Sequence, residues 1–212
     1  MVKEEIVLIG GGGHCKSVID VIESVDKFRI AGIVDTKEKM GQTISGYKLF
    51  GTDNDLINLV KEYQYFFITV GQIKNYAIRY DLYSKIKALK ATLPVIISPY
   101  AYVSPRNSIG EGTVVMHHAF INTGSKIGNN CIINTSAIIE HDTVIGNHCH
   151  ISTRTVINGD CIIGDNCFIG SNAVVINGIT IQSKVVVGAG SVVIDNLEEN
   201  KVFAGNPAGE RV

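Results

Sequence analysis

The sequence predicts two domains: a small α/β domain over residues 1–97, followed by a parallel β-helix of hexapeptide repeats over residues 98–212. Three observations lead to this prediction. In the first half, short apolar runs alternate with amphipathic stretches. In the second half, every sixth residue from Val103 to Val193 is Val or Ile, sixteen times in succession. Glycines also recur there at a spacing of eighteen residues, which indicates that three hexads make one coil.

The first domain is predicted to have a Rossmann-like βαβαβ order. Three buried strands are expected at residues 6–9, 30–34 and 65–70, with helices after residue 13, at about residues 53–63, and through the apolar residues Ile78, Leu82, Ile86 and Leu89. Residues 94–99, with a proline at each end, form the passage into the repeat.

A run of four glycines at residues 10–13 lies between the first strand and its helix. Such a loop exposes backbone N–H groups at a helix N-terminus, where the dipole favours phosphate. The loop lacks the third glycine of the dinucleotide fingerprint, whereas Asp35 lies about twenty residues on, where a ribose-binding acid would be. Four glycines exceed what a turn requires, so we favour nucleotide or nucleotide-sugar binding over a purely structural turn. Because the domain ends after about three strands, whole NAD is disfavoured.

In the repeat, the residue two positions before each Val or Ile is small, with only Ile179 and Val185 large. Because these two positions lie on the same side of a short strand, they predict a closely packed interior. Four of the five cysteines fall at the small position, which predicts buried apolar residues and not metal ligands or nucleophiles. Glycines that follow a Val or Ile position are expected where a corner turns; they are Gly110, Gly128, Gly146, Gly164, Gly170 and Gly188.

Composition restricts the partners. The chain has 19 basic and 20 acidic residues and a formal charge of −1, with no run of like charge suited to nucleic acid or an anionic membrane. No apolar stretch approaches the ~18 residues of a membrane span, and the first residues are acidic where a signal peptide is basic. We therefore expect a cytoplasmic protein whose partners are small molecules and other subunits.

His141 is the histidine best suited to chemistry. Residues eighteen apart lie above one another in a β-helix, so Gly159 in the next coil leaves space beside the imidazole. Glu140 and Asp142 flank it, and a carboxylate on one ring nitrogen makes the other a better base near neutral pH. The residues alone do not choose between the two acids, and a turn histidine among turn acids is the alternative. His148 is expected at a solvated corner.

Over nearly its whole length the chain resembles the bacterial amino-sugar acetyltransferases of the sialic acid O-acetyltransferase type, including the N-acetyltransferases of nucleotide-linked 4-amino-4,6-dideoxy sugars. The matching motifs are IGGGGH at 9–14, Asp35, VGQ at 70–72, NTSAIIEHD at 134–142 and AGNPA at 204–208. The resemblance implies a left-handed β-helix, acetyl-CoA as co-substrate, and a homotrimer with active sites between subunits. One departure is Arg154, which stands where relatives commonly have a small residue.

The resemblance also implies roles for individual residues. His141 is the expected general base, and Asp142 the acid that orients it. The expected acetyl-CoA residues are Asn134, His150, Gly159 and Ala189, of which His150 approaches the acetyl group. The expected nucleotide-sugar residues are Gly12, Gly13, His14, Asp35, Gly71 and Gln72.

We therefore predict direct transfer of an acetyl group to the 4-amino group of a nucleotide-linked 4-amino-4,6-dideoxy sugar. The alternatives are O-acetylation of sialic acid or a related nonulosonate, and a non-catalytic sugar-nucleotide-binding scaffold. A third, a zinc enzyme like the gamma-class carbonic anhydrases, is disfavoured because His141, His148 and His150 lack the spacing of that family's metal ligands. No metal is expected.

Overall fold

The computed structural model describes residues 3–73 and 75–211. The chain divides into two compact units, one ending at Ile96 and the other beginning at Ile97. Within the described residues, no helix is both long and apolar enough to cross a membrane.

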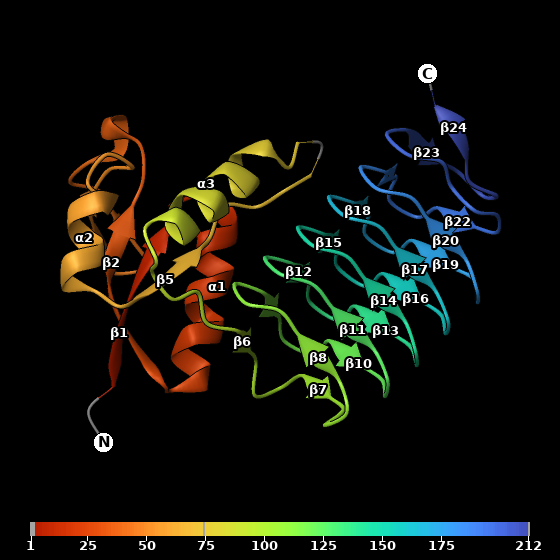
Figure 1. Cartoon of the computed structure of the whole chain (residues 1–212), viewed down its shortest axis with the longest axis horizontal. Helices are drawn as coiled ribbons and strands as arrows, with labels where there is room; N and C mark the ends of the chain where they lie inside the picture. The colour runs from red at the N-terminus through yellow and green to blue at the C-terminus, as the bar shows by residue number, and fades with distance from the viewer. Residues whose placement is uncertain (1–2, 74, 212) are drawn as a thin grey trace. The chain divides into compact units, whose positions relative to one another are not determined.

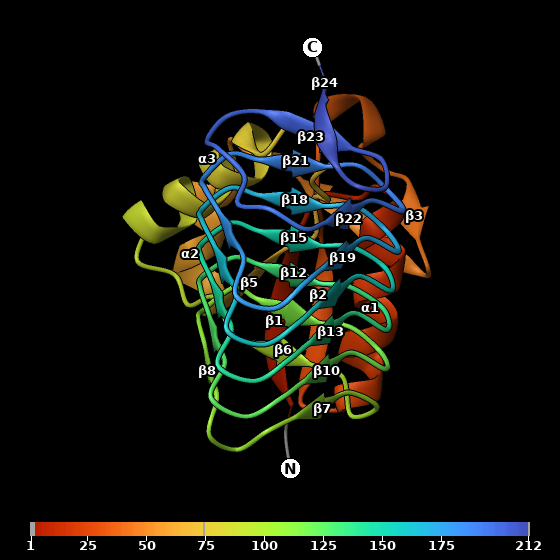
Figure 2. The same ribbon diagram turned by 90° about the vertical axis from the view of Figure 1, so that its right-hand side faces the viewer.

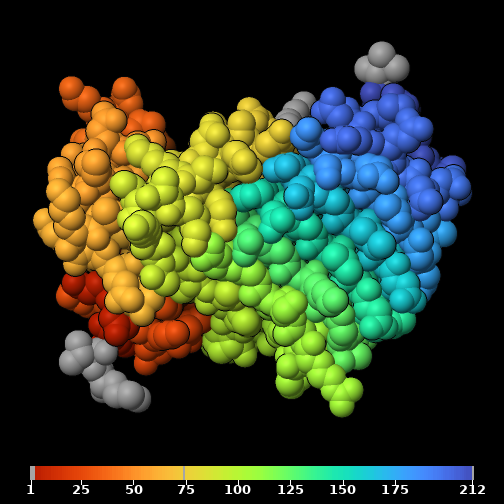
Figure 3. Space-filling view, viewed as in Figure 1, coloured from red at the N-terminus to blue at the C-terminus, as the bar shows by residue number. Residues whose placement is uncertain are grey.

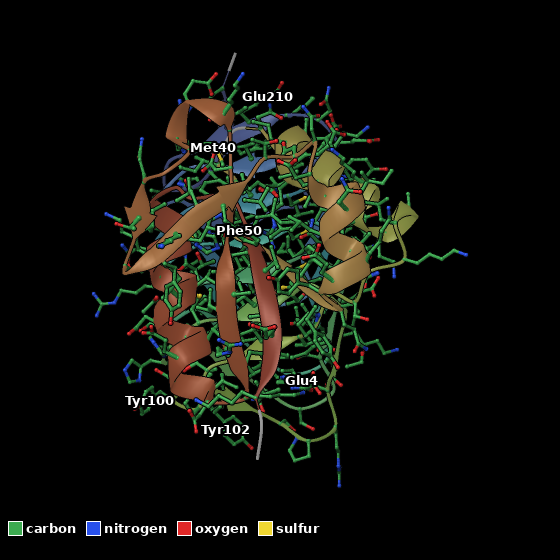
Figure 4. The ribbon with its side chains drawn as sticks, turned by 90° about the vertical axis from the view of Figure 1, so that its left-hand side faces the viewer. Glu4, Met40, Phe50, Tyr100, Tyr102 and Glu210 are labelled. Atoms are coloured by element: carbon green, nitrogen blue, oxygen red, sulfur yellow. The ribbon has the colours of Figure 1, made fainter. Side chains whose placement is uncertain are left out.

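The first unit is a five-stranded sheet with helices on both faces. Its elements are β1 (Glu4–Ile9), α1 (Gly13–Val25), β2 (Phe28–Val34), a short 3-10 helix (Lys37–Lys39), β3 (Thr43–Ile44), β4 (Tyr47–Gly51), α2 (Leu56–Glu62), β5 (Tyr65–Ile68) and α3 (Ala77–Ala88). The sheet order is β3-β4-β2-β1-β5, and only the β3–β4 pair is antiparallel. Helices α2 and α3 pack on the face that carries Val7 and Ile9, and α1 covers the other face (Figure 4).

The predicted strands and helices of this unit are confirmed, but the hairpin β3–β4 is additional to them. Its two-residue turn is Ser45-Gly46, and both residues have positive φ, 47° and 86°. Paired positive φ values are typical of the turn that matches the twist of a hairpin. A serine-glycine pair marks this turn in the sequence.

Because all the strands except β3 are parallel, their carboxyl ends lie along one edge of the sheet and their amino ends along the opposite edge. The carboxyl ends of β1, β2 and β5 lie at one edge because these strands are parallel and in register. Glu4 marks the amino end of β1, and Met40, which follows the 3-10 helix, lies toward the opposite edge (Figure 4). The glycine loop, Asp35 and Gly71 therefore meet at the carboxyl edge, where open α/β sheets bind ligands.

The second unit is the predicted parallel β-helix (Figure 1). Its strands form three flat faces, in which the two-residue strands pair in parallel at a spacing of eighteen residues. The first face consists of β6 (Ile96–Ile97), β9 (Val114–Val115), β12 (Ile132–Ile133), β15 (His150–Ile151), β18 (Phe168–Ile169), β21 (Val186–Val187), β23 (Val202–Ala204) and β24 (Gly209–Arg211). The second consists of β7 (Tyr102–Val103), β10 (Phe120–Ile121), β13 (Ile138–Ile139), β16 (Val156–Ile157), β19 (Val174–Val175) and β22 (Val192–Val193). The third consists of β8 (Ser108–Ile109), β11 (Lys126–Ile127), β14 (Val144–Ile145), β17 (Ile162–Ile163) and β20 (Thr180–Ile181). At the C-terminal end the three-residue strand β23 pairs with β21, and β24 pairs with β23 in antiparallel fashion.

The interior of the β-helix is packed by the repeating Val and Ile side chains, which form one continuous core. Columns of strands rise along the first and second faces (Figure 2), and the coils pack directly on one another (Figure 3). The four cysteines of the repeat are buried and unbridged, as predicted. They also have a polar role: Sγ of Cys149 lies 3.0 Å from the carbonyl oxygen of Gly164 in the next coil. The hydroxyl of Thr143 makes the equivalent bond to Asn158.

The expected reason for the repeated glycines needs correction. Gly128 and Gly146 do not have positive φ. A Cβ atom at Gly128 would lie 2.7 Å from the backbone of Gly146, so glycine is required there for the close approach of adjacent coils. The left-handed conformation falls two residues later at the corners, as at Asp142 and His148, with φ of 58° and 56°.

Candidate active site

His141 and Asp142 lie together at the corner that follows β13, where the second face turns into the third; we call this the second corner. Nδ1 of His141 is 3.0 Å from Oδ2 of Asp142, and 46% and 61% of the two side chains are exposed. The Asp142 contact, with further contributions from Asp160 and Glu140, raises the pKa of His141 above its ordinary value. A carboxylate on Nδ1 holds the proton there and leaves Nε2 as the basic nitrogen.

Glu140 is held elsewhere. Its Oε2 accepts a hydrogen bond of 2.6 Å from Nδ2 of Asn122, in the preceding coil. Of the two acids that flank His141 in the sequence, Asp142 is therefore the one in contact with the ring.

Glycines lie beside both members of the pair. A Cβ atom at Gly159 would be 2.5 Å from Cε1 and Nε2 of His141, and one at Gly124 would be 2.3 Å from Oδ1 of Asp142. Gly159 does not have positive φ, whereas Gly124 has a φ of 78°. The requirement at Gly159 therefore comes from the imidazole ring, which needs the space that a side chain would fill.

Asn134 and His150 form a second pair, in adjacent coils of the first face. Nδ2 of Asn134 is 3.0 Å from Nε2 of His150, and Oδ1 accepts a hydrogen bond of 2.8 Å from the backbone of Thr135. The Thr135 contact fixes the amide orientation, so Nδ2 donates and Nε2 of His150 must accept. His150 is thereby set as the neutral tautomer with its proton on Nδ1. The ring also makes an edge contact with Phe168, at 5.2 Å between centroids.

The predicted acetyl-CoA residues do not all lie together in one chain. Gly159 touches His141 at the second corner. Asn134 follows β12, and Ala189 follows β21 three coils further on, so both lie where the first face turns into the second; we call this the first corner. A hexad of extended residues spans up to roughly 20 Å at about 3.3 Å per residue. The width of the second face thus separates Asn134 and Ala189 from His141.

The glycine loop of the first unit contains two kinds of glycine. Gly10 has a φ of 104°, and a Cβ atom there would lie 2.4 Å from Val70; at Gly11 it would lie 2.5 Å from Ile44. These two glycines are required by the fold. A Cβ atom added at Gly12 or Gly13 would meet nothing within 4 Å, and neither residue has positive φ. Nothing in the described part of the chain requires glycine at these two positions, which favours a ligand as the reason.

Asp35 holds the glycine loop in place. Its Oδ2 accepts a hydrogen bond of 2.5 Å from the Gly11 N–H and an ion pair of 2.9 Å from Lys39. Oδ1 accepts from the backbone N–H of Thr36 at 2.6 Å. Hydrogen bonds and the Lys39 charge lower the pKa of this carboxyl, although burial opposes them as the largest single influence.

The end of β5 supports the same loop. The buried hydroxyl of Thr69 donates to the carbonyl oxygen of Gly10 at 2.5 Å. Arg79, only 1% exposed, donates to the carbonyl oxygens of Ile68 and Val70 at 2.7 and 2.9 Å. These contacts fix the backbone just before Gly71 and the buried Gln72. A Cβ atom at Gly71 would lie 3.5 Å from that of His14, so the predicted nucleotide-sugar residues border one loop.

Some site residues were not predicted from the sequence. Asp160 lies eighteen residues after Asp142, so the stacking rule that found Gly159 would also have found it. Thr69 and Lys39 have no such signal, because their importance depends on contacts between separate strands. One expectation was wrong: His148 is buried, with Nδ1 3.0 Å from Nδ2 of Asn130, because this corner packs the two side chains against each other. Arg154 is exposed at the first corner.

Comparison with known proteins gives consistent matches. Residues 5–86 match the PglD N-terminal domain, residues 124–159 match the bacterial transferase hexapeptide (six repeats), and residues 161–194 match the hexapeptide repeat of succinyl-transferase. The chain is 34% identical over 118 residues to UDP-N-acetylbacillosamine N-acetyltransferase from Bacillus subtilis, a match that covers 53% of this chain and 51% of that protein. The aligned segment thus spans about half the length of that curated relative.

Two solved structures are similar over the whole chain. The acetyltransferase domain of PglB from Neisseria gonorrhoeae has 31% identity and a TM-score of 0.92, with 99% of this chain and 100% of that one covered. PerB from Caulobacter crescentus, solved in complex with CoA and GDP-perosamine, has 33% identity and a TM-score of 0.92, with 100% and 99% covered.

Proposed function

Because the chain belongs to the hexapeptide-repeat acetyltransferases that carry a PglD-type N-terminal domain, we propose that it transfers acetyl groups from acetyl-CoA to nucleotide-linked amino sugars. The specific acceptor proposed is the 4-amino group of a 4-amino-4,6-dideoxy sugar. The observation that carries the proposal is the His141–Asp142 pair beside Gly159, with Nε2 on the side that the glycine leaves unfilled. The relatives named for bacillosamine and perosamine derivatives support an amine acceptor.

His141 acts as the general base in the proposed reaction. The acceptor nitrogen attacks the thioester carbonyl carbon as Nε2 of His141 takes a proton from it, and the carbon–sulfur bond breaks. CoA leaves as the thiolate and receives a proton from the imidazolium. Asp142 stabilises the charge that forms on the ring. No acyl-enzyme is needed, and all five cysteines are buried, so none offers an exposed nucleophile.

The carboxyl edge of the first unit binds the nucleotide in this proposal. Gly12, Gly13 and His14 receive the phosphates at the N-terminus of α1, and Gly71 and Gln72 border the same pocket. Asp35 already uses three hydrogen-bond acceptor positions on Gly11, Thr36 and Lys39. It therefore positions the loop, and any contact with the nucleoside falls to its remaining lone pair.

The complete site is proposed to form between subunits of a homotrimer. Asn134, His150 and Ala189 bind acetyl-CoA, but the second face separates the first corner from His141. The outer side chains of that second face are apolar throughout, being Tyr102, Phe120, Ile138, Val156, Val174 and Val192. The rings of Tyr102 and Phe120 stack at 4.9 Å. Packing this face against a second copy buries it and places the second corner of one chain near the first corner of another.

A test of the activity uses acetyl-CoA with UDP-, GDP- and dTDP-linked 4-amino-4,6-dideoxy sugars. We expect thiol release with one of them, and a product whose acetyl group survives mild base because it is an amide. An acetyl group that mild base removes would instead indicate the O-acetyl alternative. Binding of the nucleotide sugar without thiol release from any donor–acceptor pair would contradict the proposal.

A second test addresses the assembly. His141→Ala and His150→Ala variants are each expected to lose most activity. When the two are unfolded together and refolded as mixed oligomers, about a quarter of the sites receive both histidines if the residues come from different chains. Recovery of activity on mixing is the expected result. If mixed oligomers form and stay inactive, both histidines act within one chain.

A further inference from the structure

Three carboxylates surround His141, and only one of them is uncommitted. Glu140 is bound by Asn122, and Asp142 by the imidazole ring. Asp160 is exposed, and among the described residues its carboxylate makes no hydrogen bond or ion pair. Its backbone N–H donates to the carbonyl oxygen of His141 at 3.1 Å, which fixes its position one coil after the base.

Asp160 lies close enough to act with the catalytic pair. Its carboxylate, that of Asp142 and a ring nitrogen of His141 offer ligand atoms that all lie within 4.8 Å of one another. Asp160 directly follows Gly159, the residue that leaves space at the ring. The reacting atoms of an acceptor at Nε2 would thus approach an anionic carboxylate that no cation of the described chain neutralises.

We propose that Asp160 binds the protonated amino group of the acceptor sugar and so selects amine acceptors over hydroxyl acceptors. This inference rests on the proposed function. An aliphatic amine is mostly an ammonium ion near neutral pH, whereas a hydroxyl group carries no charge. A carboxylate at about 4 Å attracts an ammonium ion, whereas a neutral hydroxyl gains little from it.

The proton balance of this step is simple. The ammonium group loses one proton to solvent before it reacts, which gives the neutral amine that attacks the thioester carbon. The second proton passes to Nε2 of His141 as the carbon–nitrogen bond forms, and from there to the departing thiolate of CoA. Asp160 takes up no proton in this step and acts only in binding and orientation.

The test compares Asp160→Asn with Asp195→Asn, which removes a charge from an exposed position elsewhere on the β-helix. The probes are the nucleotide-linked 4-amino sugar that is acetylated and, as a competitive inhibitor, the same nucleotide sugar with a 4-hydroxyl group. On the pH plateau, Asp160→Asn is expected to raise KM for the amino sugar about tenfold and to change kcat less than about threefold. The inhibition constant of the hydroxyl analogue should change by less than about twofold, and Asp195→Asn should leave all of these unchanged.

Equal weakening of the amino and hydroxyl ligands would overturn the proposal, because a structural role affects both. An unchanged KM for the amino sugar would also overturn it. Loss of wild-type activity on chelation, with recovery on adding Mg²⁺ or Zn²⁺, would assign the carboxylates to a metal ion and exclude the ammonium role. If the wild type acetylates none of the amino sugars, the proposed function fails first, so the two failures are distinguishable.

Discussion

A Gly159→Ala variant tests how strongly the reaction rate depends on the position of the His141 ring. The new Cβ atom would lie 2.5 Å from Cε1 and Nε2 of the imidazole, and 3.1 Å from Cδ2. To reach an ordinary contact distance the ring must move by about 1 Å, while Nδ1 is tethered to Asp142 at 3.0 Å. The backbone at Gly159 does not have positive φ, so alanine introduces no conformational strain there.

The magnitude follows from this displacement. A misplacement of about 1 Å at a catalytic group costs on the order of 10²-fold in rate. Folding should be affected little, because replacing glycine where the backbone permits alanine stabilises a protein by about 0.4–1 kcal/mol through the unfolded state. The ring can move toward solvent, since 46% of the His141 side chain is exposed.

The assay measures kcat, both KM values and the melting temperature. We expect kcat to fall about 10²-fold at a nearly unchanged melting temperature. Gly146→Ala is the contrasting variant, because its Cβ atom would lie 2.8 Å from the backbone of Asp165 and must lower the melting temperature. A Gly159→Ala enzyme with wild-type kcat would refute the reasoning that the glycine serves the imidazole.

Three further predictions follow from the same contacts. Replacing Asp142 with Asn removes the carboxylate that raises the pKa of His141, so the acid limb of kcat/KM should move to lower pH in a pH–rate profile; an unmoved limb would assign it to another group. Gly12→Ala should weaken nucleotide-sugar binding measured by calorimetry without lowering the melting temperature, whereas Gly10→Ala should lower that temperature; equal behaviour of the two would exclude a ligand-based need for glycine. Cys149→Val leaves the carbonyl oxygen of Gly164 without a hydrogen-bond donor, which costs about 1–3 kcal/mol of stability. The Cys149→Val variant should therefore have a lower melting temperature than Cys149→Ser, and the reverse order would show that side-chain packing alone determines stability at this position.

The β-helix was predictable because one short rule repeats along it. Each of the sixteen hexads that end at Val103 to Val193 places one branched side chain inward, and all but two of them pair it with a small one, so the same signal is repeated along the domain. The hairpin at residues 43–51 escaped prediction because its two strands are short and occur once. Its serine-glycine turn is a weak signal without the pairing partner that the fold supplies.

Site residues were predictable where sequence spacing determines spatial distance. Stacking at eighteen residues relates His141 to Gly159, and the same arithmetic leads to Asp160. The hydrogen bond between Asp35 and Gly11 joins the ends of two strands, and no repeat in the sequence relates these two positions. The ion pair between Asp35 and Lys39 depends on a short helix that no periodicity marks. Sequence reasoning therefore identified Asp35 but not how its hydrogen bonds are already used.

The tautomer of His150 also lay beyond the sequence. It follows from the amide orientation of Asn134, which is fixed by one backbone hydrogen bond from Thr135. The family resemblance implies that both residues bind acetyl-CoA. Only the geometry indicates that His150 serves as a hydrogen-bond donor through Nδ1 and not as a second base.

The most direct test of the central claim is the acetyl-transfer rate of His141→Asn at saturating acetyl-CoA and nucleotide-linked amino sugar, with both binding constants measured by calorimetry. If His141 is the general base, the rate falls by about 10²- to 10⁴-fold while both substrates bind with nearly wild-type affinity. A variant that retains the wild-type rate would contradict the account.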